Sequence, residues 1–420
     1  MESALPGCVV GSEVGANLDH SLIAGYDWGW RFCLEAACWE ARNDFKGSGW
    51  AGMRWLLWMM AAASFCISLL GLLGLVRADE LYGRTQLVER QMVWLLLAVP
   101  VMAAAALVPY RLLRPWSMPL YGLTLLLLAV VLFMPPINGS RRWIPLGLFD
   151  LQASEPARLA FVLALAAWLM HRRSQQSLRG LAIPVCMAAV PMLLIIREPD
   201  LDTALLFVPV LGGMLYAAGA RAWHLGAALV FGAACLPLLW MQMSAEQQSR
   251  VVSVFVQRDG GPAPAGDGFH LHQSKQVLAL GGLGGSLLQD EPPTDDSAAW
   301  QLPAARTDFI FVMIGERFGL AGCGVLLGLY GFLIIAGLVI AGSCTEPWGR
   351  LVAVGITVLL GVQVILNTGM TVGLLPITGT ALPLCSYGGS SLLCTYASMG
   401  LLINIRIHQT LEATGRPFWS

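Results

Sequence analysis

The sequence predicts an all-α membrane protein: a polytopic transmembrane helical bundle with about ten spans and a long extracytoplasmic loop between spans 7 and 8. Of the 420 residues, 56% are hydrophobic and only 12% are charged, whereas a soluble domain carries about 25% charged residues. The apolar residues also form runs of roughly 20, the length that a helix needs to cross a bilayer. The formal net charge of −1 gives no bias toward nucleic acid, so we expect membrane lipid and no nucleic acid as partners.

The first fifty residues (1–50) are expected to form a cytoplasmic N-terminal extension. Glu2 and Glu13 stand where a secretory signal would carry positive charge, and no apolar core of adequate length follows them. Residues 26–45 mix tryptophans with charged residues, so they fit either an amphipathic helix at the membrane surface or a poorly ordered extension. The ten cysteines show neither a disulfide pattern nor a zinc spacing, so we expect no metal site built on thiolates.

Residues 51–410 are expected to form the ten-helix membrane domain, and residues 411–420 a cytoplasmic tail. The ten apolar runs begin near Trp55, Met92, Ser117, Leu159, Gly180, Thr203, Ala222, Phe318, Leu351 and Gly389. An even number of spans places both termini on one side, and the arginines of the connections favour the cytoplasm for that side. We therefore predict a multi-pass protein of the cytoplasmic (inner) membrane with both termini cytoplasmic. Arg158 is expected to snorkel at the end of the short run at Leu159.

Three connections on the opposite side differ from ordinary loops. They cover residues 135–156, the large extracytoplasmic loop 243–306, and residues 375–387. Long loops without regular structure are usually functional. The third connection is rich in proline, glycine and hydroxyl side chains within an apolar context, which predicts irregular backbone at membrane depth. Such backbone is tolerated only where it is buried in protein or lines a cavity.

The first connection carries Arg142-Trp143 and then Gln152-x-Ser154-Glu155. An arginine beside a tryptophan is typical of a simple anchor at the membrane interface. The alternative is a cationic patch for a phosphate group, because a guanidinium group matches phosphate geometry with two hydrogen bonds.

Residues 197–203 bring three acids and an arginine to the edge of the bilayer. Such charges must face a cavity or pair with each other, because exposing them to lipid is costly. The plainer interpretation is a capped turn, in which Asp200 or Asp202 caps the next helix.

The large loop ends at Thr307-Asp308, where polar sequence meets an apolar helix. Asp308 fits an N-cap of that helix. It also fits a half-buried carboxylate with a raised pKa, which suits a general base. Glu316 lies about two turns deeper. An acid at that depth is a functional candidate, unless it pairs with Arg317 or with another helix.

Taken together, these segments resemble the SEDS family of shape, elongation, division and sporulation proteins, which includes RodA, FtsW and SpoVE. The resemblance runs from about Trp55 to Arg406, and Ile377-Thr378-Gly379 favours the RodA-like elongation branch. It rests on motifs in the family's order: Arg142-Trp143, Gln152-x-Ser154-Glu155, Pro199-Asp200-Leu201, Gln273-Ser274, Thr307-Asp308-Phe309-Ile310-Phe311, Asn367-x-Gly369-Met370 and Pro383-x-x-Ser386-Tyr387-Gly388-Gly389-Ser390-Ser391.

The resemblance implies a peptidoglycan glycosyltransferase that polymerises lipid II, a disaccharide peptide linked to undecaprenyl pyrophosphate, at the outer face of the cytoplasmic membrane. It also implies a class B penicillin-binding protein as partner. The family's essential acid maps onto Asp308. The candidate substrate-binding residues are Arg142, Trp143, Gln152, Ser154, Glu155, Arg158, Asp200, Gln273, Ser274, Lys275, Thr307, Ser386, Tyr387 and Ser390.

The chain departs from the family at several positions. Asp202 stands where a glycine is usual, and Arg158 stands where a lysine is usual. Ala304 and Arg306 replace an acid and a histidine. These departures fit a divergent enzyme, and they also keep open a non-catalytic scaffold that activates a partner transpeptidase.

The implied substrate sets the chemistry. An α-linked donor that yields a β-linked polymer requires inversion, hence one in-line displacement. Asp308 is then the general base on the acceptor hydroxyl, and Arg142, Arg158 and Lys275 contact the leaving pyrophosphate. No cofactor is certain, and a divalent cation (Mg²⁺ or Mn²⁺) that bridges the pyrophosphate stays open.

The rival function from another class is a lipid II flippase. A flippase would need ionisable residues along the middle of several spans, because carrying a charged pyrophosphate through hydrocarbon is costly. Apart from His224 and Glu316, the predicted spans hold almost none.

Overall fold

The computed structural model describes residues 49–135, 141–145, 147, 150–170, 177–257, 267–288, 302 and 304–410. The chain divides into two units, Met1–Gly49 and Trp50–Ser420, and the described elements belong almost entirely to the second. The predictions for the N-terminal extension, for residues 26–45 and for the tail 411–420 lie outside the described residues and stay predictions.

The apolar runs form helices, because a segment surrounded by lipid must satisfy its own backbone hydrogen bonds. The helices are α2 (Gly49–Tyr82), α3 (Leu87–Leu107), α4 (Ser117–Val131), α5 (Ser154–Leu169), α6 (Leu178–Arg197), α7 (Leu201–Leu205), α8 (Phe207–Ala217), α9 (Ala222–Gln242), α10 (Ala245–Phe255), α11 (Asp267–Leu280), α12 (Ile310–Ser343), α13 (Pro347–Thr371) and α14 (Gly389–Thr410). Short 3₁₀ turns cover Tyr110–Leu112 and Ser286–Leu288. Strands β1 (Trp143–Pro145) and β2 (Asp150–Gln152) pair antiparallel, with Trp143 opposite Gln152.

The predicted all-α membrane bundle is confirmed. Six of the described helices are long and apolar enough to cross a membrane: Trp55–Tyr82, Leu87–Leu107, Arg179–Arg197, Ile310–Ser343, Pro347–Thr371 and Gly389–His408. Shorter apolar helices cover Ser117–Val131 and Leu201–Ala217. Every run predicted from the sequence lies on a helix, and the run near Thr203 is shared by α7 and α8.

One predicted boundary is wrong: α12 begins at Ile310 and not near Phe318. The helix continues through a kink at Gly319, where φ is 66° and ψ is −163°. A side chain at this glycine would meet the backbone of the Gly-rich turn 281–285. The carbonyl of Gly282 accepts a hydrogen bond from Leu320 N at 2.9 Å. The turn after α11 therefore satisfies a backbone amide beside the kink.

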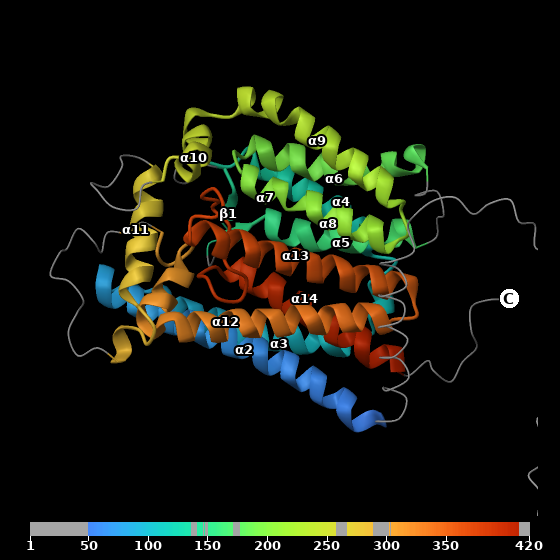
Figure 1. Cartoon of the computed structure of the whole chain (residues 1–420). Coiled ribbons are helices and arrows are strands. Elements are labelled where there is room, and N and C mark those ends of the chain that lie inside the picture. Colours follow the sequence, from blue (N-terminus) through green and yellow to red (C-terminus); the bar gives the residue numbers. More distant parts are fainter. Residues whose placement is uncertain are drawn as a thin grey trace, which may run out of the picture. The chain divides into compact units, whose positions relative to one another are not determined.

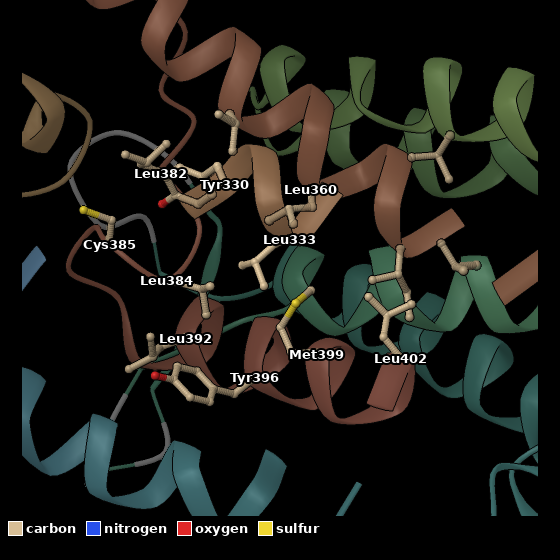
Figure 2. Close-up of a cluster of buried hydrophobic side chains, with 14 of the residues drawn as sticks. Tyr330, Leu333, Leu360, Leu382, Leu384, Cys385, Leu392, Tyr396, Met399 and Leu402 are labelled. Atoms are coloured by element: carbon tan, nitrogen blue, oxygen red, sulfur yellow. The ribbon is translucent and has the colours of Figure 1, made fainter. Parts of the chain in front are cut away.

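The buried core reaches into the irregular segment between α13 and α14. Figure 2 shows side chains of this segment, including Leu382, Leu384 and Cys385, among residues of α12 and α14. All three are nearly fully buried. The hydroxyl of Tyr330 on α12 donates to Pro383 O at 2.5 Å. The prediction that this irregular backbone is buried in protein is confirmed.

Candidate active site

Helix α12 has no side-chain cap, so the Asp308 carboxylate does not serve to cap this helix. The N-cap residue is Phe309, which makes no side-chain capping hydrogen bond. The amides of Thr307, Asp308 and Phe309 all donate to Ala304 O, at 3.0–3.2 Å. The interpretation of Asp308 as an N-cap is therefore wrong, because the backbone turns before the helix begins and the helix starts one residue later.

The backbone around Asp308 is fastened by α13 and by the irregular segment 372–388. Asn367 Nδ2 on α13 donates to Asp308 O and to Thr380 O, both at 2.8 Å. The Ser386 hydroxyl donates to Thr307 O and accepts from Leu382 N at 2.8 Å. The predicted site residues Thr307 and Ser386 thus lie together, and Ser386 uses its hydroxyl to hold the segment that carries Asp308.

Helix α2 fastens the same segment from another side. Arg306 Nε donates to Asp79 Oδ1 at 2.9 Å, and Arg306 Nη2 donates to Gly83 O at 2.8 Å. Tyr387 N donates to Arg306 O at 3.2 Å. Three separate parts of the fold therefore fix the backbone just before α12.

A second carboxylate faces the same place. Asp202 Oδ2, on α7, accepts a hydrogen bond from Gly379 N at 3.0 Å. A Cβ atom placed on Gly379 would lie 3.9 Å from Asp202 Oδ2 and 3.9 Å from Asp308 Oδ2. The two carboxylates therefore approach one patch of backbone that carries no side chain.

The surroundings of Asp308 raise its pKa from 3.8 to about 6. The largest cause is burial, which disfavours the charged form, and the negative charge of Asp202 adds to it. A hydrogen bond from Thr307 and the charges of Arg250 and Arg142 act in the opposite direction. A carboxylate with this pKa is ionised at neutral pH, yet it is a stronger base than an ordinary aspartate, as general-base catalysis requires.

Arg142 lies over the turn between α6 and α7. Its Nε is 3.6 Å from Asp200 Oδ2, and its Nη2 donates to Pro199 O. Asp200 also caps α7, because its Oδ1 accepts from Thr203 N at 3.2 Å. The capped turn and the pairing of charges, which the sequence left as alternatives, are both present.

Glu198 in the same turn is fully buried. Neither of its carboxylate oxygens has a hydrogen-bond partner among the described residues. Burial, together with the charge of Asp200, raises its pKa to about 8. Glu198 is therefore protonated at neutral pH, and the net charge around Arg142 is less negative than the sequence indicates.

Another pair of charges lies on α5, beside Gln363 of α13, which is one turn from Asn367. Glu155 and Arg158 form an ion pair in the first turn of α5, and both are buried. They line a cleft with Gln363 of α13 and with Thr395 and Ser398 of α14. The expectation that Arg158 snorkels is wrong, because the partner that stabilises its charge lies inside the bundle.

Helix α11 brings three more of the predicted residues to the end of α13. The Ser274 hydroxyl donates to Thr371 O at 2.7 Å, and both Gln273 and Ser274 are buried. Lys275 Nζ donates to Gln257 Oε1 at 3.0 Å, and Gln257 Nε2 donates to Gly373 O at 2.7 Å. Figure 1 shows α10, α11 and β1 at the same end of the helices, on the left.

The remaining predicted residues are spread over neighbouring elements. Trp143 and Gln152 face each other across the β1–β2 pair and are partly exposed. Ser154 is buried at the start of α5, and Ser390 is buried at the start of α14. Tyr387 is half-buried in the irregular segment.

Sequence reasoning missed three contributors beside Asp308. Arg250 lies on α10 within the large loop, where nothing but its charge distinguishes it. Asp202 was considered as a helix cap, as one of three acids at the bilayer edge and as a departure from the family, and Asn367 only as part of a motif. The signal for Asp202 was present, since an extra acid beside a polar turn is unusual in so apolar a chain.

Glu316 is a structural residue. Its two carboxylate oxygens accept from Arg77 Nε and Nη2 of α2, each at 2.7 Å. Glu316 is fully buried. The alternative of a pair with another helix is therefore the correct one.

The described residues include no group of three or more His, Cys, Asp or Glu side chains that could hold a metal ion.

The chain is similar in sequence to known proteins. The family model described as cell cycle protein, of FtsW, RodA and SpoVE, matches residues 54–411. Peptidoglycan glycosyltransferase MrdB of Escherichia coli is 34% identical over 77% of this chain and 87% of its own length. Probable peptidoglycan glycosyltransferase FtsW of Alkalilimnicola ehrlichii is 33% identical over 89% of this chain and 94% of its own length.

Solved structures show the same family similarity. A peptidoglycan synthase complex, described as coordinating polymerization and crosslinking, contains a chain that is 31% identical with a TM-score of 0.71. The match covers 84% of this chain and 98% of that one. The rod shape determining protein RodA of Thermus thermophilus is 29% identical with a TM-score of 0.62, over 84% of this chain and 97% of that one.

Proposed function

The chain belongs to the FtsW, RodA and SpoVE family of cell cycle proteins, and we propose that this peptidoglycan glycosyltransferase polymerises lipid II with Asp308 as the general base. The observation that carries the proposal is the carboxylate of Asp308. It is held on a backbone fastened by three elements, and its pKa is raised to about 6.

The proposed reaction is one in-line displacement. The hydroxyl of the acceptor sugar attacks the anomeric carbon of the donor, and the bond from that carbon to the pyrophosphate oxygen breaks. The hydroxyl proton passes to the Asp308 carboxylate, and undecaprenyl pyrophosphate leaves with the electron pair. The donor is α-linked, so a single displacement yields a β-linked glycan.

The leaving pyrophosphate is already a weak base, so it needs positive charge rather than an acid. We propose that Arg142 contacts it, because Arg142 acts electrostatically on Asp308 from the neighbouring turn. Lys275 on α11 and Arg250 on α10 are further candidates. Arg158 contributes less, because the buried Glu155 already neutralises it.

A Mg²⁺ or Mn²⁺ ion is proposed only as part of the bound substrate. The described residues hold no group of three or more His, Cys, Asp or Glu side chains that would bind the ion without substrate, and the displacement above has no step that runs through it.

We propose that the partner is a class B penicillin-binding protein, which cross-links the product. The similarity to a chain of a peptidoglycan synthase complex supports this proposal. We further propose that the protein lies in the cytoplasmic membrane with both termini inside, so that Asp308 faces the outer leaflet. The lipid tail of the substrate then stays in the membrane while its sugars remain in water.

The test is polymerisation of purified lipid II by the purified chain in detergent, alone and with a class B penicillin-binding protein. We expect Asp308→Asn to lower the rate by about 10²–10⁴-fold, the usual cost of losing a general base. The matched control is Glu89→Gln, which removes an exposed acid in the first turn of α3 and should leave the rate unchanged. Wild-type rates for Asp308→Asn would contradict the assignment of the base. Transbilayer movement of lipid II without any polymer would instead favour a flippase.

A further inference from the structure

Asp202 is an acid that the proposed reaction does not use, although it lies at the reaction centre. It belongs to α7, and its Oδ2 accepts a hydrogen bond from Gly379 N at 3.0 Å. The Cβ position of Gly379 is 3.9 Å from this oxygen and 3.9 Å from Asp308 Oδ2. Asp202 and Asp308 thus approach the same glycine, one from α7 and the other from the turn before α12.

We infer that Asp202 is a positioning residue for the catalytic carboxylate: it holds the Gly379 backbone against Asp308, and its negative charge keeps Asp308 a strong base. The inference rests on the proposed function, because it concerns how Asp308 is tuned for that reaction.

The mechanical part follows from the hydrogen bonds of the segment 378–380. Asp202 holds this segment through Gly379 N, and Asn367 holds it through Thr380 O at 2.8 Å. The same Asn367 amide also holds Asp308 O. Asn367 on α13 therefore links the segment 378–380 to the backbone of Asp308. Asp202 on α7 holds the same segment through a second hydrogen bond.

The electrostatic part follows from the charges that face Asp308. Arg250 acts from α10 and Arg142 acts from the segment before β1, and both favour the charged carboxylate. Thr307 also stabilises that form through a hydrogen bond. Asp202 is the charged neighbour that acts the other way. Without it, burial alone would oppose the two arginines and the Thr307 hydrogen bond, and Asp308 would become a weaker base.

Burial raises the pKa of Asp202, and the negative charge of Asp200 adds to this effect, while a hydrogen bond and two arginines act in the opposite direction. A backbone amide that donates to a carboxylate favours its ionised state, and Gly379 N is such a donor. Arg250 and Arg142 act on Asp202 as well as on Asp308. The charges of the same two arginines therefore act on both carboxylates.

The test separates charge from hydrogen bonding with two variants. Asp202→Asn removes the charge but keeps an oxygen that can accept from Gly379 N. Asp202→Gly removes both and restores the residue that is usual in the family. The rate of lipid II polymerisation is measured against pH for both variants, for wild type and for Glu89→Gln. The substrate's own titration is the same in all four proteins, so it cancels in the comparison.

We expect the acidic limb of the rate profile to move to lower pH in both Asp202 variants. The shift should be on the order of one pH unit, the size that a like charge gives at a half-buried site. The plateau rate of Asp202→Gly should fall about tenfold below that of Asp202→Asn, because only the glycine variant releases the Gly379 backbone.

An unmoved acidic limb in Asp202→Asn would overturn the electrostatic part, and equal plateau rates for the two variants would overturn the mechanical part. Both outcomes differ from a failure of the proposed function, in which Asp308→Asn would remain active.

Discussion

Replacing Asn367 with leucine is expected to lower both the stability of the protein and its turnover. The Asn367 amide donates two hydrogen bonds of 2.8 Å, to Asp308 O and to Thr380 O. Asn367 is fully buried, in the last two turns of α13. Leucine has a similar volume, so the substitution removes the hydrogen bonds without opening a large cavity.

The stability loss can be worked out from these contacts. Each carbonyl that loses its donor in a buried place costs about 1–3 kcal/mol. Asn367 Oδ1 is buried and has no hydrogen-bond partner among the described residues. Leucine removes this unsatisfied acceptor, and its removal offsets part of the lost stability. We therefore expect the free energy of unfolding to fall by about 2–3 kcal/mol. Asp308 also loses its attachment to α13, and a displacement of about 1 Å at a catalytic group costs about 10²-fold in rate.

The assay compares Asn367→Leu with Thr357→Val on the same helix. The Thr357 hydroxyl is also buried and donates to Ala353 O at 2.7 Å, so this hydrogen bond stays within α13 and does not involve the segment 304–309. Thermal unfolding in detergent measures stability, and lipid II polymerisation measures turnover at a temperature where both variants are folded. Thr357→Val should lose stability and keep its rate. A rate for Asn367→Leu that matches the Thr357→Val rate would refute the positioning role of Asn367.

Two further predictions concern the charged residues. Arg142→Ala should reduce polymerisation more than Arg158→Lys does, because the lysine keeps the charge that pairs with Glu155 and is the usual residue in the family. Equal rates for Arg142→Ala, Arg158→Ala and Arg158→Lys would remove both arginines from the site. Glu316→Ala should destabilise the protein by about 3–5 kcal/mol, because it leaves the half-buried guanidinium of Arg77 without its main partner. A melting temperature equal to that of Glu89→Gln would contradict this expectation.

Much of the fold was predictable because the solvent is lipid. Hydrocarbon leaves helices as the only stable form for a single apolar run, so the ten runs could be located without any knowledge of their neighbours. The start of α12 could not be located in this way. Its first turns depend on a kink at Gly319 that the carbonyls of the 281–285 turn support, and that turn is distant along the chain.

The candidate site was predictable only in part. Asp308 was found through its motif and through its place at the edge of an apolar run. The sequence left its role open between helix cap and base, and the structure excludes the cap because Phe309 takes that position. Arg158 was assigned to the pyrophosphate, although the ion pair with Glu155 holds it inside the cleft.

The sequence by itself determined the class of the protein and its family and singled out Asp308 as the candidate base, because these depend on apolar run length and on short local motifs. Only the tertiary structure decided which charges act on that acid. Asp202, Arg250 and Asn367 come from α7, α10 and α13, and they meet Asp308 only when those helices pack. Electrostatic interactions weaken with distance in space and take no account of separation along the chain, so no local pattern could reveal this grouping.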